Sequence, residues 1–226
     1  MSSVFRWSGL VFLSLGCGGS GGSASECPEG FVSIEGPVGA FCISAYEMHL
    51  AAGKLGKKDQ GAGFPDGSTE VSRLVSGPGL KPVKTSWYQA FAACKTQGWD
   101  LCTSEQWEDA CDGVAGPGGS TYPSVDGEFV PGRCSIGDHR VGLEMPLTLT
   151  GAMPDCRTDA GVYDLQGNLW EWTDPNMRAE DGKPIVDKRG GGHYGAAPVT
   201  CTRNALGQHV PEWDGTIGFR CCVALK

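Results

Sequence analysis

Eleven cysteines in a chain of 226 residues constrain the fold more than any other feature of this sequence. With Cys17 set aside for the reason given below, ten remain, and an even number in an exported chain predicts up to five disulfides. The chain is long enough to bury a core, so the disulfides are expected to supplement packing. The ten expected to pair are Cys27, Cys42, Cys94, Cys102, Cys111, Cys134, Cys156, Cys201, Cys221 and Cys222.

Residues 1–17 have the pattern of an export signal, in which Arg6 is the only charge and residues 10–15 form a short apolar stretch. The stretch ends at Cys17 in a pattern that resembles a bacterial lipobox, although Ser14 stands where that box usually has Leu. We therefore expect lipidation of Cys17 and a place at the cell envelope or outer surface. Residues 18–26 would form a Gly/Ser-rich tether with a reach of about 15 Å. The alternative is an ordinary cleaved signal, which would leave a secreted or periplasmic protein.

The charge of the chain argues against one class of partner. It carries 18 basic and 26 acidic residues, and its one basic cluster is Lys54, Lys57 and Lys58. A surface that binds a phosphate backbone needs a larger concentration of Lys and Arg. We expect no nucleic-acid partner and one globular domain over residues 27–226.

Local patterns predict a few regular elements joined by long loops. Residues 31–34 and 40–43 favour a hairpin, which Cys27 and Cys42 would flank and join. Capping boxes begin two helices, one at Ser86 that stops at Gly98 and one at Thr103 that stops at Gly113. Residues 51–79 resemble a surface loop, and the Gly- and Pro-rich second half predicts short strands. The class is α+β, with core positions for the indoles of Trp87, Trp107 and Trp170.

Three segments, in this order, resemble the formylglycine-generating (sulfatase-modifying factor) family. Residues 82–90 and 98–108 are similar to its "PV…SW.DA…GKRLPTEAEWE" stretch. Residues 161–172 (GVYDLQGNLWEW) are similar to "GLYDMVGNVWEW". Residues 189–192, Arg203 and residues 218–221 are similar to "RGGS…R…GFRC". The resemblance implies that family's C-type-lectin-like fold, with two main helices, short strands and many ordered loops.

The resemblance also implies a chemistry that this chain lacks the residues to perform. The family oxidises a substrate cysteine to formylglycine with two copper-binding cysteines, whose positions fall here at Gly195 and near Thr200. Copper(I) needs soft thiolate ligands, and Cys201 alone is close to the right register. Cys201 also aligns with a structural cysteine of the family, whose partner here would be Cys111. We therefore expect no catalytic residues, and copper only if the chain is an oxidase after all.

The remaining disulfides follow from the resemblance alone. It implies bonds from Cys94 and Cys102 to the adjacent cysteines Cys221 and Cys222, in either order. It further implies a bond between Cys134 and Cys156.

The resemblance implies a structural calcium ion as well. In the family, the segment that corresponds to residues 164–171 wraps Ca²⁺ with two side chains and two carbonyl oxygens. Here Asp164 and Glu171 would supply carboxylates, and Gly167 and Leu169 would supply carbonyl oxygens, a hard donor set that suits calcium. In the alternative reading, Asp164 caps a turn and Glu171 pairs with an arginine.

The family's groove defines a candidate binding surface, with His193, Tyr194, Arg203 and Trp213 as its expected residues. Packing and a buried arginine ion pair are the alternative roles of the first three. Without the catalytic pair, the chain is expected to be a non-catalytic module that binds a protein, peptide or glycan, since ordered loops on a rigid scaffold suit binding. The alternatives are a formylglycine-generating-type oxidoreductase acting on protein cysteine, and an accessory subunit of an envelope complex.

Overall fold

The computed structural model describes residues 26–50, 74–112, 122–138, 142–174, 185–194, 199–202, 205–207 and 215–225. The expected signal at residues 1–17, Cys17 and the tether up to residue 25 lie outside these residues. So do Gly113, Gly195, Arg203 and Trp213.

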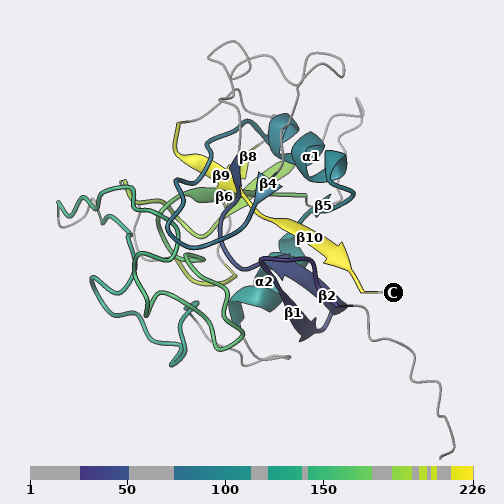
Figure 1. Cartoon of the computed structure of the whole chain (residues 1–226). Coiled ribbons are helices and arrows are strands. Elements are labelled where there is room, and N and C mark those ends of the chain that lie inside the picture. The colour runs from purple at the N-terminus through teal and green to yellow at the C-terminus, as the bar shows by residue number, and fades with distance from the viewer. Residues whose placement is uncertain are drawn as a thin grey trace, which may run out of the picture.

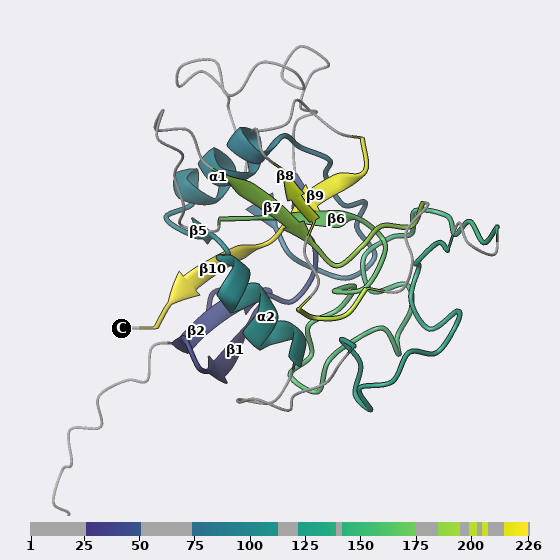
Figure 2. The same ribbon diagram turned by 180° about the vertical axis from the view of Figure 1, so that it is seen from behind.

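One sheet joins the start of the domain to its end. A tight turn connects β1 to β2, as the hairpin pattern predicted, and all three pairings in the sheet order β1-β2-β10-β5 are antiparallel. β10 therefore lies between the hairpin and β5 in both views of the ribbon (Figures 1 and 2). The strands are β1 (Phe31–Gly36), β2 (Gly39–Ser44), β5 (Asp100–Leu101) and β10 (Cys221–Ala224).

A second sheet, in the order β8-β7-β6-β9, carries the segments that surround the candidate site. β6 pairs with β9 in parallel, and the other two pairings are antiparallel. Its strands are β6 (Trp170–Thr173), β7 (Val186–Arg189), β8 (Ala205–Gly207) and β9 (Ile217–Phe219).

The expectation of an unbroken surface loop over residues 51–79 is wrong at its C-terminal end. β4 (Leu74–Val75) pairs with β3 (His49–Leu50), and Leu74 is buried in the core. The polar residues around Leu74 suggested an exposed position. Burying its apolar side chain is nevertheless favourable in free energy, because it removes apolar surface from water. Residues 51–73 lie outside the described residues.

Both predicted helices begin at the predicted capping boxes. Ser86 accepts from the N–H of Gln89, whose side chain accepts from the N–H of Ser86, at the start of α1 (Trp87–Thr96). Thr103 and Gln106 make the same reciprocal pair at α2 (Ser104–Asp112). α1 ends before Gly98, which has φ 76°, a conformation that glycine adopts without a steric cost.

The core has two main parts, one beside each helix. The first packs α1 and Trp172 against β9 and β10. The second packs α2 and Trp107 against the β1–β2 hairpin. In both views α2 lies against the hairpin, and α1 lies beside β5 (Figures 1 and 2). A small third cluster contains Ile136 and Val199 in the loops.

Five disulfides connect these parts. The pairs are Cys27–Cys42, Cys94–Cys221, Cys102–Cys222, Cys111–Cys201 and Cys134–Cys156. Every pair agrees with the sequence analysis, and the order that it left open is resolved as Cys94 to Cys221 and Cys102 to Cys222. Because consecutive residues of a strand face opposite sides, Cys221 and Cys222 connect β10 to different parts of the core.

The second half of the chain is mostly ordered loop, as expected for this α+β fold. In both views the loops between α2 and β6 gather on the side of the molecule away from the C-terminal end (Figures 1 and 2). Tyr163 makes an isolated bridge with Arg157 and lies outside the named strands. Within the described residues, no helix has the length and apolarity that crossing a membrane requires.

Candidate functional site

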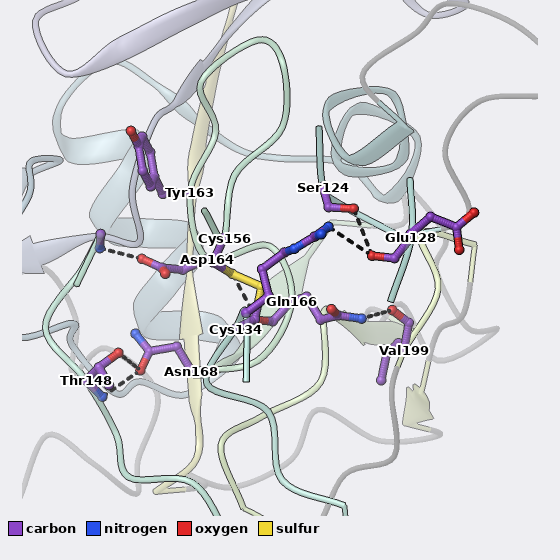
Figure 3. The surroundings of a disulfide bond; sticks show 12 residues. Ser124, Glu128, Cys134, Thr148, Cys156, Tyr163, Asp164, Gln166, Asn168 and Val199 are labelled. Atoms are coloured by element: carbon purple, nitrogen blue, oxygen red, sulfur yellow. Dashed lines mark hydrogen bonds between the residues drawn. A yellow bond between two sulfur atoms is a disulfide. The ribbon is translucent and has the colours of Figure 1, made fainter. Parts of the chain in front are cut away.

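Asn168 holds together the loops around the candidate groove. It has φ 55°, and its backbone N–H donates to the carbonyl oxygen of Ser135 at 2.7 Å. Its side-chain oxygen accepts from the N–H of Thr148 at 2.9 Å (Figure 3). Its Nδ2 donates to Glu47 at 2.6 Å. One residue in the left-handed region thus bonds to segments from three parts of the chain, which fixes the loops relative to the core.

His193 is fixed from both sides by these loops. The carbonyl oxygen of Asn168 accepts from the backbone N–H of His193 at 2.9 Å and lies 2.7 Å from its Nδ1. The carbonyl oxygen of His193 in turn accepts from the N–H of Met145 at 3.2 Å. Because a carbonyl oxygen only accepts, Nδ1 carries a proton, and Nε2 of the neutral ring is the acceptor. The structure therefore orients the imidazole before any ligand arrives.

Tyr194 follows His193 and has an exposed fraction of 61%, the highest among the large apolar side chains that the structure describes. Leu143 is also exposed, and it lies two residues before the hydrogen-bonded Met145. Two of the four expected groove residues thus lie on one ordered surface, which we call the 192–194 face after residues 192–194. Arg203 and Trp213, the other two, lie outside the described residues.

A disulfide joins two of the loops around Asn168. The Cys134–Cys156 bond joins the loop that contains Ser135 to the loop that precedes Asp164, and Gln166 lies beside it (Figure 3). Nε2 of Gln166 donates to the carbonyl oxygen of Val199 at 3.1 Å, which ties the same region to the segment before Cys201. Long ordered loops need such connections, because they have few backbone partners of their own.

Three carboxylates are buried close to the guanidinium of Arg220. Glu47, Asp164 and Glu171 are each at most 3% exposed, and Arg220 is fully buried. Nε of Arg220 donates to both oxygens of Glu171, at 2.8 and 2.9 Å, and the indole N–H of Trp107 donates to Oε2 at 2.7 Å. Glu47 accepts from the N–H of Leu169 and from Asn168.

Burial dominates the protonation of all three acids. It raises the pKa of Glu171, although Arg220 and Trp107 act in the opposite direction. Burial raises the pKa of Asp164 too, although the backbone N–H of Gly151 and the charge of Arg220 both lower it. The pKa of Glu47 lies well above its ordinary value because burial, Asp164 and Glu171 all disfavour its charged form. The guanidinium of Arg220 does not offset the desolvation of the three carboxylates.

These contacts match the alternative roles of the predicted calcium ligands. Glu171 pairs with an arginine, and Oδ2 of Asp164 accepts from the N–H of Gly151 at 2.7 Å, beside a turn where Asp164 has φ 58°. Both oxygens of Glu171 already accept hydrogen bonds from Arg220. The positive charge of this guanidinium would repel a calcium ion at the same carboxylate. In this arrangement Glu171 does not fit a calcium ligand. Nor do the described residues contain a group of three or more His, Cys, Asp or Glu side chains that could hold a metal. Calcium binding by Asp164, Gly167, Leu169 and Glu171 stays a prediction.

Cys201 is bonded to Cys111 and is 1% exposed. Of the two positions where the resemblance places the copper-binding cysteines, Thr200 is described and Gly195 is not, and neither is a cysteine. Every cysteine that the structure describes is in a disulfide, so this part of the chain offers copper no thiolate.

The two indoles of β6 differ in burial. Trp170 was expected in the core, yet it is only partly buried, where the first core cluster meets the small loop cluster. Trp172 is the buried one of the two, and its N–H donates to the carbonyl oxygen of Thr85. Alternation in β6 puts both rings on one side of the strand, and position along the strand decides which is covered. Periodicity alone gives no signal of that position.

The family sequence model of the sulfatase-modifying factor enzyme 1-like domain matches residues 67–225 of this chain, which is more than half of its length. The chain belongs to this family. The sulfatase-modifying factor domain thus accounts for the two helices, the short strands and the ordered loops around Asn168.

Curated members of the family differ in what their names say about activity. The chain is 34% identical over 153 residues to the inactive C-alpha-formylglycine-generating enzyme 2 of Bos taurus, covering 62% of this chain and 48% of that protein. It is 26% identical over 232 residues to the formylglycine-generating enzyme of Bos taurus, covering 88% of this chain and 59% of that protein. It therefore spans only about half the length of these relatives.

Solved structures agree on the fold. The crystal structure of CarF aligns with a TM-score of 0.59 at 16% identity, covering 88% of this chain and 99% of that one. At that identity the likeness concerns the fold alone.

Proposed function

We propose that this sulfatase-modifying factor domain is a non-catalytic module that binds a peptide segment of another protein on the 192–194 face. The observation that carries the proposal is the Cys111–Cys201 disulfide, which removes the one thiol near the family's catalytic register. Oxidation of a cysteine by the family's route needs a copper(I) ion on a pair of thiolates, and one bonded sulfur does not replace the pair.

Two further observations support binding rather than chemistry. His193 is held by Asn168 and Met145, and Tyr194 is exposed beside it, so the face presents an oriented acceptor and an aromatic ring. Tyrosine rings contribute large contact areas at a small loss of side-chain entropy. The name of the bovine relative at 34% identity, an inactive enzyme, also favours this reading.

The alternative function is a formylglycine-generating-type oxidoreductase acting on protein cysteine, as the name of the 26% identical relative suggests. The two functions are separated by a thiol count under non-reducing conditions, followed by incubation of the protein with copper(I) and a cysteine-containing peptide. We expect Cys201 to be blocked by Cys111 and the peptide thiol to remain unchanged by mass spectrometry. A free Cys201 together with conversion of the peptide would overturn the proposal.

Binding itself is tested on an immobilised library of random peptides. Peptides retained by the native protein should be lost by Tyr194→Ala and kept by Val38→Ala, which truncates another exposed apolar side chain on the β1–β2 hairpin. Equal retention by both variants would place binding elsewhere, and no retention by the native protein would argue against a peptide ligand.

We further propose that the domain acts at the cell envelope or outer surface, anchored through a lipid on Cys17. Five disulfides are typical of a protein that folds in an oxidising compartment, which supports export. Cys17→Ser should move the protein from the membrane fraction to the soluble exported fraction. If the unsubstituted protein is also recovered in the soluble exported fraction, a secreted or periplasmic form would be supported instead.

Calcium at residues 164–171 remains a proposal with a direct test. An ion held by Glu171 would have to displace Arg220, so binding would be coupled to a local rearrangement. Calcium is titrated into EDTA-treated protein while the midpoint of thermal unfolding is recorded. A rise that Asp164→Asn abolishes would support the site. An unchanged midpoint would argue against calcium at these residues.

A further inference from the structure

Among the residues that the structure describes, two lysines lie over aromatic rings, and they differ in one respect. Nζ of Lys95 lies 5.5 Å from the ring centroid of Phe91, and it forms an ion pair with Asp100. Nζ of Lys188 lies 5.0 Å from the ring centroid of Trp170, and no acidic group among the described residues pairs with it. Lys188 is therefore a cation whose counterion is missing from the described part of the chain.

Trp170 connects this lysine to the 192–194 face. A Cβ built on Gly192 would lie 3.0 Å from Cδ1 of Trp170 and 3.3 Å from its Nε1, so the edge of the indole lies against the backbone of Gly192. The indole N–H donates to no acceptor among the described residues, and the side chain is partly exposed. The indole N–H thus lies beside Gly192, the residue before His193, and the ammonium of Lys188 lies over the same ring.

We propose that Lys188 and Trp170 bind a carboxylate of the peptide ligand, so that the module selects acidic segments. This inference rests on the proposed function, and it names the ligand's chemical class. A carboxylate has two acceptor oxygens, which match one ammonium and one indole N–H. In a chain with 26 acidic and 18 basic residues, a partly buried lysine with no acidic partner among the described residues marks a site of charge complementarity. The ring beneath the ammonium adds a cation–π attraction that holds it in place.

The matched lysines make the test specific. The probes are an acetylated hexapeptide of alternating Glu and Leu and the same peptide with Gln in place of Glu. Binding to the intact, oxidised protein is followed by the NMR shift of the Trp170 indole N–H, identified by its loss in Trp170→Phe. We expect the Glu peptide to bind about tenfold more tightly than the Gln peptide, as charged hydrogen bonds generally contribute.

Lys188→Met should remove this preference, and Lys188→Arg should keep it. Lys95→Met removes the same charge from another lysine–aromatic pair and should change nothing. Equal losses in Lys95→Met and Lys188→Met would reduce the effect to net charge and overturn the inference. If the two peptides bind equally and Tyr194→Ala abolishes their binding, recognition of a carboxylate would be overturned, while the peptide-binding function would stand. Failure of the native protein to bind either peptide would count against both. Thermal midpoints of all variants show whether each one is folded.

Discussion

At the scale of single residues, the buried charges around Arg220 decide how stable the domain is. Arg220 is the guanidinium that neutralises Glu171, and Asp164 and Glu47 lie close enough to affect the same pKa values. Removing one partner of a buried ion pair leaves an uncompensated charge in a medium that solvates it poorly.

Arg220→Met should therefore lower the free energy of unfolding by about 3–5 kcal/mol, measured by urea denaturation under non-reducing conditions. Arg133→Met is the control, because its partner Asp126 is exposed and solvent screens that pair; we expect no resolvable loss. Comparable losses in the two variants would show that the burial of Arg220 is not what matters.

Glu47 predicts a dependence of stability on pH. Its raised pKa means that the native state takes up a proton at a higher pH than the unfolded chain does. As the pH falls from 7 toward the ordinary glutamate value of about 4.5, this group contributes increasing stability to the native state. Glu47→Gln removes the titration, so the unfolding free energy of the native protein should rise relative to that of the variant over this range. A constant difference would contradict the raised pKa.

At the scale of elements, the turn over residues 164–168 depends on close approach of two backbones. Gly167 has φ 85°, and a Cβ there would lie 2.3 Å from the carbonyl oxygen of Ser135. Gly161 has almost the same φ, 84°, and a Cβ there would meet nothing within 4 Å. Substitution of Gly161 therefore measures the free-energy cost of a left-handed conformation alone. Substitution of Gly167 measures that cost together with the cost of a steric clash.

Gly161→Ala should cost about 1 kcal/mol, the strain of alanine at positive φ. Gly167→Ala should cost about 3 kcal/mol or more, because Ser135 and the loop behind it must also move. Denaturant midpoints of the two variants check this. A Gly167→Ala cost close to that of Gly161→Ala would mean that the loop yields easily, and the rigidity argued for His193 would then be doubtful.

Elements also show where sequence reasoning succeeds and where it ends. Capping boxes at Ser86 and Thr103 are local hydrogen-bond patterns, and both helices begin where those patterns predict. The burial of Leu74, the exposure of Trp170 and the pairing of Glu171 with Arg220 depend on segments far apart in the chain. Residue types constrain such contacts, but only the assembled fold decides among the possible partners.

At the scale of the whole molecule, the disulfides restrain one another. Cys94–Cys221 closes a sequence separation of 127, but Cys102–Cys222 already brings the same two regions together. With Cys102–Cys222 intact, the first bond closes an effective loop of only about ten residues.

Replacing Cys94 and Cys221 by Ser should therefore cost about 3 kcal/mol, not the roughly 5 kcal/mol that the full separation implies. Replacing all four cysteines should cost more than twice the loss of either pair, since the second removal then opens a loop of roughly thirty residues, measured through the intact Cys111–Cys201 bond. Guanidinium unfolding of the three variants tests this, and simple additivity of the two pairs would rule it out.

The adjacent cysteines of β10 also bear on how the protein is made. Synthesis proceeds from the N-terminus, so Cys94, Cys102 and Cys111 leave the ribosome well before Cys201, Cys221 and Cys222, their partners. An oxidant that acts on the emerging chain meets only wrong partners for those three thiols. Native pairing must await the last strand or be reached by exchange, so a chain cut short before β10 would retain reactive thiols that mark it as incomplete.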